Sequence, residues 1–404
     1  MSGGCPSRPD IAPDMVRRWD LARETEAVGC PFVAASKLHD GPDIFFNLSD
    51  DLRNVDGGSW IVTRADLQRE VLQKSELFSS RGISGFSAIL GESWPLMPVE
   101  LDAPDHMRYR KLINPLFSPR RMDEIEAGVR ESAIELIEAV RHRGGCEFMT
   151  AYARELPVNV FLRLMGLPLA EVDTFRKWED EMMHSDDVAV RAGAAHALKA
   201  YLLDIIGRRR AEPTDDLISH LVTATLDDRP LDDDAVLGLC FFLYIAGLDT
   251  VAATLSFIFA TLAEQPDLQN RLRSTPAEIP EAVEELIRAF GTVVTSRYLT
   301  EDTVFHGVAM RKGDRVITPL GVASRDPAEY EDANTLNIDR LSTRNISFGA
   351  GPHRCIGSHL ARREITLTLE EWLARIPEFR LAPNGKPVPN VVTVWGHDTL
   401  QLEW

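Results

Sequence analysis

The chain has 404 residues, of which 44% are hydrophobic and 26% charged, and its formal net charge at pH 7 is -18. These are ordinary values for a globular protein with a sizeable core. A surface that is negative on average repels nucleic acid and anionic membranes, so we expect neither as a partner.

The five cysteines, at positions 5, 30, 146, 240 and 355, form no close pair. This spacing favours neither a disulfide framework nor a cysteine-rich zinc site. The N-terminal sequence is polar, without the pattern of a signal peptide or membrane anchor, and we see no uninterrupted apolar run long enough to cross a bilayer. We therefore expect a cytoplasmic protein.

The first hundred residues give weak signals. Residues 1 to about 40 are rich in proline, glycine and acidic residues, which favours an irregular segment. Residues 59–63 read as a strand and residues 64–73 as a helix. The glycines and prolines of residues 79–102 predict a mobile loop with a short helix, and loops of that length are often lids.

Helical periodicity dominates from residue 105 onward. The longest signal, residues 232–265, is apolar on nearly all sides through its first half, which is typical of a helix buried in a core. The other predicted helices span 105–114, 119–142, 158–165, 170–183, 191–211, 215–226, 266–274, 279–290 and 358–375.

Short strands are predicted near the C-terminal end, with turns at Gly307 and at Lys312-Gly313. The predicted strands lie within 293–319, and 391–402 reads as a terminal hairpin. The chain is therefore expected to be mainly α with a small β-rich region, forming a single domain over residues 1–404.

The most informative stretch runs from Phe348 to Gly357 and reads Phe-Gly-Ala-Gly-Pro-His-Arg-Cys-Ile-Gly. An isolated cysteine is usually an inert small residue. Here glycines permit unusual backbone angles, and the helix expected to open at Ile356 favours negative charge on sulfur. Cys355 is thus a candidate thiolate ligand for a metal.

Two further motifs carry polar groups on predicted helices. Glu285 and Arg288 lie one turn apart, which is typical of a surface ion pair but also permits a buried bidentate one. Asp249 and Thr250 lie within the apolar helix at 232–265, where an acid needs a partner or a purpose. Thr250 could also simply donate to a carbonyl one turn earlier.

Together these three motifs resemble the signatures of the cytochrome P-450 family, in the family's order. Gly-Leu-Asp-Thr, Glu-Glu-Leu-Ile-Arg and His-Leu-Ala-Arg-Arg-Glu-Ile are similar to segments of its bacterial class I camphor hydroxylase group. The resemblance extends from about residue 59 to residue 404. It implies the cytochrome P-450 fold, a helical haem-binding domain whose long central helix crosses the haem, and hydroxylation of an unactivated C–H bond.

The resemblance also implies roles for individual residues. Cys355 would be the axial ligand of the iron of haem b (iron protoporphyrin IX), within a loop that includes Phe348 and Gly349. Asp249 and Thr250 would be catalytic, relaying protons from solvent to the reacting dioxygen. The haem propionates would be met by His106, Arg110, Arg297 and His353, and Glu285 and Arg288 would be a structural pair.

Substrate contacts follow from the same resemblance. Trp94 stands where the camphor hydroxylases have a tyrosine that bonds the substrate ketone, which argues against camphor because indole can only donate and is larger. The lining is nearly all apolar and fits a compact terpenoid or norisoprenoid, although each member could equally be a core residue. The expected lining residues are Phe86, Trp94, Met97, Phe242, Ile245, Val293 and Val394.

Two basic residues align with partners of the acid on the oxygen-activating helix. Arg176 paired with Asp249 would gate proton delivery, and His184 is the second candidate partner. Both residues could instead be solvated helix side chains.

Electrons are expected from a separate protein, because no flavin or iron-sulfur pattern occurs in the sequence. The resemblance implies a two-iron two-sulfur ferredoxin with an NADH-dependent ferredoxin reductase, acting with O2 on a small hydrophobic substrate. A locally basic set near the cysteine would steer an acidic ferredoxin: Arg108, Arg110, Arg120, Arg121, Arg344, Arg354, Arg362 and Arg363. The alternatives are a peroxide-driven enzyme of the same fold and a non-catalytic haem-binding sensor.

Overall fold

The computed structural model describes residues 11–48, 58–92, 94–340 and 344–404. The chain forms two compact units. The first contains the residues up to Ile83 together with Pro280–Cys355 and Pro387–Asp398, and the second contains Ser84–Ile279, Ile356–Lys386 and Thr399–Trp404.

The described N-terminal segment is helical, so the expectation of an irregular segment up to residue 40 was wrong there. Helix α1 (Leu21–Val28) begins at Asp20, whose carboxylate accepts from the Arg23 amide, and ends at Gly29 in the left-handed region. Helix α2 (Pro31–Ser36) starts with a proline. The residues that read as helix breakers act here as a C-cap glycine and an N1 proline.

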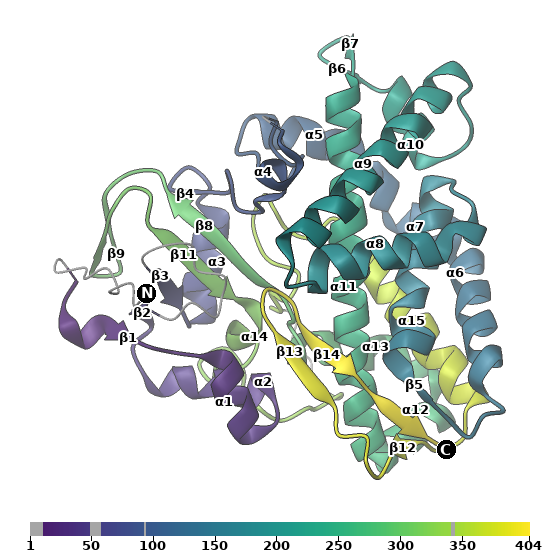
Figure 1. The fold of residues 1–404 in the computed structure, drawn as a ribbon. Helices are drawn as coiled ribbons and strands as arrows, with labels where there is room; N and C mark the ends of the chain where they lie inside the picture. Colours follow the sequence, from purple (N-terminus) through teal and green to yellow (C-terminus); the bar gives the residue numbers. More distant parts are fainter. Residues whose placement is uncertain (1–10, 49–57, 93, 341–343) are drawn as a thin grey trace. The chain divides into compact units, whose positions relative to one another are not determined.

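A six-stranded sheet is the main β element of the first unit, with strand order β1-β2-β3-β11-β8-β4 (Figure 1). The parallel pair β3–β11 lies at its centre, and β2–β3 and β11–β8 are antiparallel. Its strands are β1 (Val16–Arg17), β2 (Ile44–Asn47), β3 (Ser59–Val62), β4 (Phe78–Ser79), β8 (Val294–Leu299) and β11 (Arg315–Pro319).

Edge-to-face aromatic contacts hold one face of this sheet. Phe46 lies 5.1 Å from Trp60 between ring centroids, and Phe78 lies 5.2 Å from Phe305. Such pairs stabilise a core beyond the area that they bury. The remaining elements of the unit are α3 (Ala65–Gln73), α13 (Ile279–Ala289, whose first residue belongs to the second unit), α14 (Leu320–Ala323), the hairpin β9 (Thr303–Phe305) and β10 (Val308–Met310), and the pair β13 (Val388–Val391) and β14 (Trp395–Thr399).

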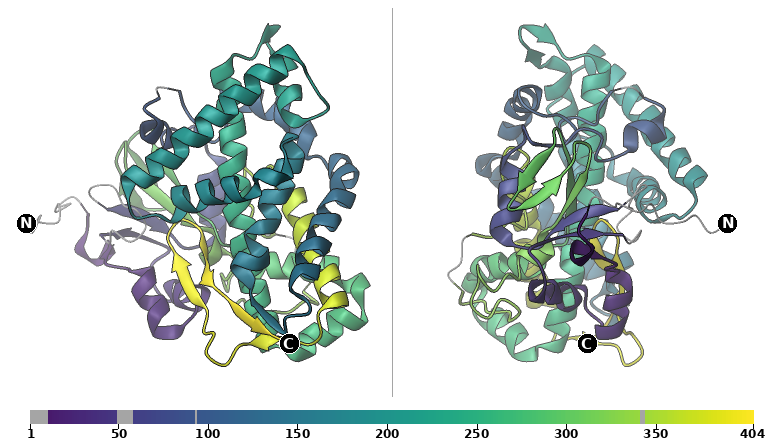
Figure 2. Two further views of the ribbon diagram at one scale, coloured as in Figure 1. Left: turned by 45° about the vertical axis from the view of Figure 1, so that its right-hand side comes forward. Right: turned by 90° about the vertical axis from the view of Figure 1, so that its left-hand side faces the viewer.

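The second unit is mainly helical and is organised around α11 (Asp233–Glu264), as Figures 1 and 2 show. This helix is long and apolar enough to cross a membrane, with a mean hydropathy of 2.0, but 67% of that stretch is buried inside the protein. It is the core helix that the sequence predicted. The helices around it are α7 (Glu155–Met165), α8 (Val172–His184), α9 (Val188–Ala211), α10 (Leu217–Thr223), α12 (Pro266–Ser274) and α15 (Ser358–Arg375).

An aromatic cluster lies between the C-terminal half of α11 and α15 in this unit. Phe148 stacks on Phe259 with ring centroids 4.1 Å apart, and Trp372 of α15 meets both rings edge-on. Helix α6 (Pro119–Val140) packs along α15, and a small sheet joins β5 (Gly145–Glu147), β15 (Gln401–Glu403) and β12 (Arg380–Leu381). The predicted terminal hairpin over 391–402 is therefore wrong, because β14 pairs with β13 while β15 pairs with β5 and β12.

Two helices of the second unit come before α6 in the chain. Helix α4 (Phe86–Leu90) is the short helix predicted within residues 79–102, and α5 (Asp105–Ile113) follows the loop. Helix α10 is connected to α11 by a hairpin of β6 (Thr225–Leu226) and β7 (Arg229–Pro230).

Candidate functional site

The cysteine loop belongs to the first unit and closes on itself. The Cys355 amide donates to the Phe348 carbonyl at 2.8 Å, and the Gly349 amide donates to the Ile346 carbonyl at 2.7 Å. The Cys355 side chain is exposed. Helix α15 begins at Ser358, as the predicted helix 358–375 does and two residues after Ile356, with Gly357 as its N-cap. A thiol held on a closed loop, three residues before a helix, is positioned to bind a metal as thiolate.

Glycine is required in this loop at one position above all. Gly351 has φ +68, and a Cβ there would lie 2.8 Å from the Gln73 Cα at the end of α3. Gly349 also has a positive φ, +72, but a Cβ there would meet no atom within 4 Å. Gly351 therefore lets the loop approach α3, whereas Gly349 leaves open space beside the loop.

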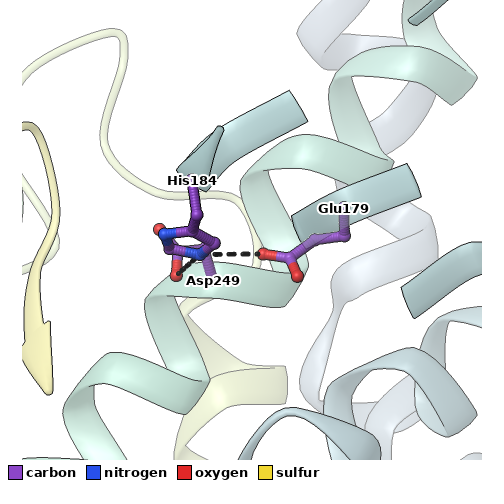
Figure 3. A group of neighbouring side chains, drawn as sticks. All are labelled: Glu179, His184 and Asp249. Atoms are coloured by element: carbon purple, nitrogen blue, oxygen red, sulfur yellow. Dashed lines mark ion pairs between the residues drawn. The ribbon is translucent and has the colours of Figure 1, made fainter. Parts of the chain in front are cut away.

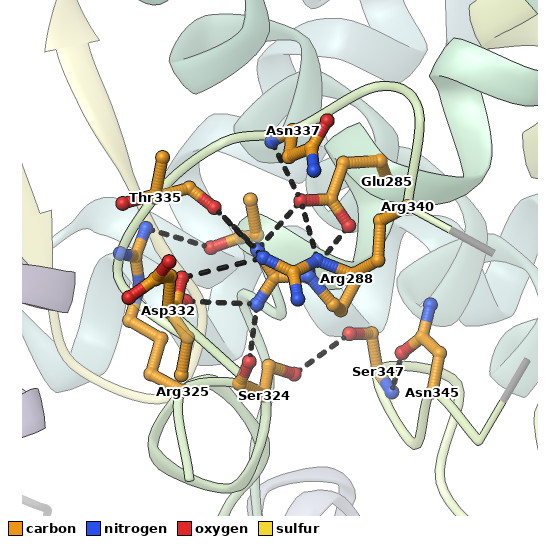
Figure 4. Close-up of polar contacts among 12 residues, drawn as sticks. Glu285, Arg288, Ser324, Arg325, Asp332, Thr335, Asn337, Arg340, Asn345 and Ser347 are labelled. Carbon is orange, nitrogen blue, oxygen red and sulfur yellow. Dashed lines mark hydrogen bonds and ion pairs between the residues drawn. The ribbon is translucent and has the colours of Figure 1, made fainter. Parts of the chain in front are cut away.

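Glu285 and Arg288 form a buried bidentate pair, and the surface alternative is excluded. Both side chains are at most 3% exposed, with Nε to Oε2 at 2.7 Å and Nη2 to Oε1 at 2.8 Å. Arg288 also donates to the carbonyls of Ser324, Ala333 and Thr335 at 2.6, 3.0 and 3.3 Å. The guanidinium thus fastens the segment 324–335 to α13 (Figure 4).

This network reaches the cysteine loop through two serines. The Ser324 hydroxyl lies 3.0 Å from the Ser347 hydroxyl, and the Ser347 amide donates to the Asn345 side chain at 2.7 Å (Figure 4). Ser347 immediately precedes Phe348 in the chain. Hydrogen bonds therefore connect the buried ion pair to the start of the loop that carries Cys355.

Two of the predicted propionate partners lie in the first unit. Arg297 is 3% exposed on β8, and its Nη1 donates to the Thr295 hydroxyl at 3.1 Å and to the Ser296 carbonyl at 2.7 Å. The His353 Nε2 lies 3.2 Å from the Ser80 hydroxyl. Both side chains are thereby held in fixed positions.

The other two predicted propionate partners lie on α5 of the second unit. His106 is 1% exposed, and Arg110 follows one turn later with its Nε donating to the Asn114 side chain at 2.9 Å. The i, i+4 spacing places these cationic or donor groups on one face of the helix, as the sequence predicted.

Helix α11 carries an exposed strip in the middle of its buried length. Ala246 and Gly247 are exposed, Asp249 and Thr250 are half-buried, and a Cβ on Gly247 would meet no atom within 4 Å. The Thr250 hydroxyl donates to the Ala246 carbonyl at 3.1 Å, which is the local bond that the sequence left open. An apolar strip with one acid and one alcohol is available at this point of the core helix.

Asp249 meets a histidine, not the arginine that was considered. His184 Nε2 lies 3.5 Å from Asp249 Oδ1 and 3.7 Å from Glu179 Oε1 (Figure 3). Burial would lower the pKa of His184, but the two carboxylates outweigh it and raise the pKa to about 10. Arg176 instead pairs with Glu155 and with Asp173, both at 3.1 Å, so the proposed Arg176–Asp249 pair was wrong.

Burial also raises the pKa of Glu179, the second carboxylate of this cluster. The sequence analysis missed Glu179. A signal was available, because Glu179 shares the inward face of α8 with the buried Phe175 and Met182 at helical spacing. It likewise missed Arg340, whose Nε donates to Glu285 at 3.2 Å and for which no sequence pattern exists.

Most of the predicted substrate lining belongs to the second unit. Trp94 and Met97 are buried in its core, and a Cβ on Gly238 would lie 3.5 Å from the Trp94 ring. The half-buried members that pack against this core are Phe86, Phe242 and Ile245. In the first unit, Val293 pairs with Val394 in an isolated bridge, and both are half-buried.

Comparison with known proteins identifies the family. The model of the family described as cytochrome P450 matches residues 190–396 of this chain. The chain is 39% identical to the probable cytochrome P450 127A1 of Sinorhizobium fredii, over 98% of this chain and 96% of that protein. The chain belongs to the cytochrome P450 family. It is therefore a haem-dependent oxidoreductase, and its homologues are named as monooxygenases.

Solved P450 structures agree over the whole length. The crystal structure of CYP101C1 has a TM-score of 0.89 and 32% identity, covering 99% of this chain and 100% of that one. The crystal structure of CYP101J2 has a TM-score of 0.88 and 31% identity, covering 99% of both. The mycinamicin IV hydroxylase/epoxidase of Micromonospora griseorubida is 34% identical over 85% of this chain and 87% of its own length. The mainly helical P450 fold predicted from sequence is confirmed.

The donor set of this P450 suits a haem. Cys355 offers an exposed sulfur on a fixed loop, and Gly349 leaves space beside it. On α11, Ala246 and Gly247 are exposed, and a Cβ on Gly247 would meet no atom within 4 Å. Arg297, Arg110 and the two histidines offer the donors that carboxylates need. Within each unit these groups are of the kinds that an iron porphyrin with two propionates requires, namely a thiol and nitrogen donors in the first unit and nitrogen donors in the second.

Proposed function

We propose that this P450 hydroxylates a small hydrophobic substrate, a compact terpenoid or norisoprenoid, with O2 and two electrons delivered by a ferredoxin. The observation that carries the proposal is the acid and alcohol on the half-exposed strip of α11, Asp249 and Thr250. A peroxide-driven enzyme would need no proton relay at this position. The same argument separates the proposal from a sensor without turnover, and the whole chain is taken as one haem-binding domain.

Cys355 would bind the haem iron as thiolate, within the loop that Phe348 and Gly349 begin. When bound, the haem supplies activation of dioxygen, which a thiolate ligand favours through electron donation. The propionates would be held by Arg297 and His353 of the first unit and by His106 and Arg110 of the second. The Glu285–Arg288 pair would keep the loop in place through Ser324 and Ser347.

Proton delivery is assigned to residues of α11 and α8. The Thr250 hydroxyl would hold a water molecule beside the reacting dioxygen and pass protons to it. Asp249 would collect protons from solvent, and its ion pair with His184 would decide when the carboxylate is available. Two half-buried groups 3.5 Å apart can separate by side-chain rotation, so this pair can act as a gate.

The predicted lining residues indicate the class of substrate. Phe86, Trp94, Met97, Phe242 and Ile245 are apolar except for the Trp94 N–H. A compact hydrocarbon skeleton with at most one polar group suits such a surface. Val293 and Val394 of the first unit complete the proposed lining.

The electron partner is proposed as a two-iron two-sulfur ferredoxin with an NADH-dependent reductase, in the bacterial cytoplasm. Family membership establishes only that electrons and O2 are required. The basic set that would steer an acidic ferredoxin is partly neutralised, because several members pair with carboxylates: Arg108 with Asp227, Arg121 with Glu124, Arg344 with Glu329 and Arg363 with Asp123.

A spectral titration tests the substrate proposal. Purified holoprotein is titrated with a panel of terpenoids and norisoprenoids, and the low-spin to high-spin shift of the haem is measured. We expect several compact members to shift the spectrum and then to be hydroxylated with NADH, reductase and ferredoxin. A panel in which camphor alone shifts the spectrum, or product formed faster with peroxide than with ferredoxin, would overturn the proposal.

A further inference from the structure

One buried carboxylate ties together the segment that carries much of the proposed lining. Glu100 is 3% exposed. Its Oε1 accepts from the Ser84 amide at 2.8 Å and from the Ser84 hydroxyl at 2.7 Å. Its Oε2 accepts from the Leu96 amide at 2.8 Å and from the Ser87 hydroxyl at 3.4 Å.

These bonds fasten both ends of the segment at one point. The Leu96 carbonyl in turn accepts from the Glu100 amide at 2.9 Å, so residues 96 and 100 are linked in both directions. The Ser84 hydroxyl also accepts from the Phe86 amide at 3.3 Å, at the start of α4. The described residues 84–92 and 94–100 are therefore joined at the Glu100 carboxylate, which closes a loop.

The side chains inside the closed loop lie against α11. Phe86 meets Phe241 edge-on with ring centroids 5.8 Å apart. A Cβ on Gly238 would lie 3.5 Å from the Trp94 ring and 3.6 Å from the Met97 amide nitrogen. The loop thus holds Phe86, Trp94 and Met97 at fixed places along one helix.

All four of these donors are neutral, and a carboxylate is the group that can accept from all of them. Both carboxylate oxygens are acceptors, whereas a glutamine of the same shape has one acceptor oxygen and one N–H2 donor group. In Glu100→Gln the N–H2 group of the glutamine would therefore face N–H or O–H donors in place of one carboxylate oxygen. The substitution opens half of the closure without changing side-chain volume.

We propose that Glu100 is a positioning residue for substrate selection, which holds Trp94 and Met97 against α11 and so keeps the lining small. This rests on the proposed function, because it assumes that these residues line the substrate site. Releasing the segment lets the Trp94 ring and the Met97 backbone move away from Gly238. Compact substrates then lose contacts, and bulkier ones gain room.

The test compares Glu100→Gln with wild type and two controls, one in the same segment and one on α8. Ser87→Ala removes only the 3.4 Å contact, and Glu181→Gln makes the same chemical change on α8, at a residue that pairs with Lys177 at 3.7 Å. The reduced carbon monoxide spectrum and the Tm of each holoprotein are measured first. Dissociation constants for one compact and one bulkier terpenoid follow from the spin-state shift.

We expect Glu100→Gln to weaken the compact ligand about tenfold or more, equivalent to about 1.4 kcal/mol. The compact-to-bulky affinity ratio should fall by a similar factor, with an unchanged carbon monoxide spectrum. The controls should stay within about twofold of wild type. Ser84→Ala should give an intermediate loss, and Ser84→Ala with Glu100→Gln together should be no worse than Glu100→Gln alone.

Amide hydrogen exchange of the peptide covering residues 84–100 gives a readout that needs no substrate. Exchange at Ser84 and Leu96 should speed up in Glu100→Gln and not in Glu181→Gln. Unchanged exchange, or an equal loss of affinity for both ligands that follows the fall in Tm, would overturn the inference. A wild-type protein that binds neither ligand would overturn the proposed substrate class instead, and the exchange result would still decide the role of Glu100. If Glu100→Gln does not fold, Ser84→Ala carries the same measurements.

Discussion

Replacing Arg288 by lysine should destabilise the protein strongly, because the guanidinium makes five hydrogen bonds in a buried position. Two go to Glu285 and three to the carbonyls of Ser324, Ala333 and Thr335. An ammonium group has three donors at a single point, so at least two of these bonds are lost. Hydrogen bonds to charged groups contribute about 1.5–3 kcal/mol each, which gives a loss of about 3–6 kcal/mol.

A separate estimate agrees with this range, since breaking a buried ion pair costs about 3–5 kcal/mol. The free energy of unfolding is measured by urea titration of the holoprotein, followed by circular dichroism and by the Soret band. Arg380→Lys is the matched control, because Arg380 pairs with Glu403 at 2.7 Å but is 75% exposed and should lose less than about 1 kcal/mol. A loss below about 1 kcal/mol in Arg288→Lys, or equal losses in both variants, would refute the reasoning.

Two further predictions concern α11 and α8. Thr250→Val keeps the shape of the side chain but removes its hydroxyl, so O2 and NADH consumption should continue while the product formed per NADH falls several-fold; unchanged coupling would exclude a role for the hydroxyl. His184 has its pKa raised to about 10 in the folded protein, since Asp249 and Glu179 outweigh the effect of burial, so its stabilisation is complete below about pH 6.5 and is lost as the pH rises through about 10. His184→Gln should therefore lower the Tm most at pH 6 and least near pH 10, and a Tm difference that grows with pH would contradict this.

Local sequence signals predicted the elements that local physics determines. The uniform apolar stretch of α11 and the periodicity of α15 gave helices within two residues of the observed bounds. The pair of Glu285 and Arg288 at i, i+3 could be placed on one helix face. The burial of this pair could not be predicted, because it depends on the carbonyls of residues 324–335, which lie far along the chain.

Two of the failures share a physical cause, which is pairing between distant segments. The last strand, β15, pairs with β5 some 250 residues earlier, and no turn residue announces such a partner. Asp249 faces His184 and Glu179 because α8 packs beside α11, so the choice between Arg176 and His184 was settled by helix packing. The N-terminal helices were missed because Gly29 and Pro31 read as breakers, although they cap and start helices.

The central claim, that Cys355 binds the haem iron as thiolate, is tested most directly by the spectrum of the reduced, carbon monoxide-bound protein. Wild type should show the red-shifted Soret band of a thiolate-ligated haem, and Cys355→Ala should lose it. Cys146→Ala is the matched control, because burial, with a smaller contribution from Glu147, raises the pKa of that thiol to about 12 and it should keep the band. A red-shifted band that persists in Cys355→Ala would contradict the assignment.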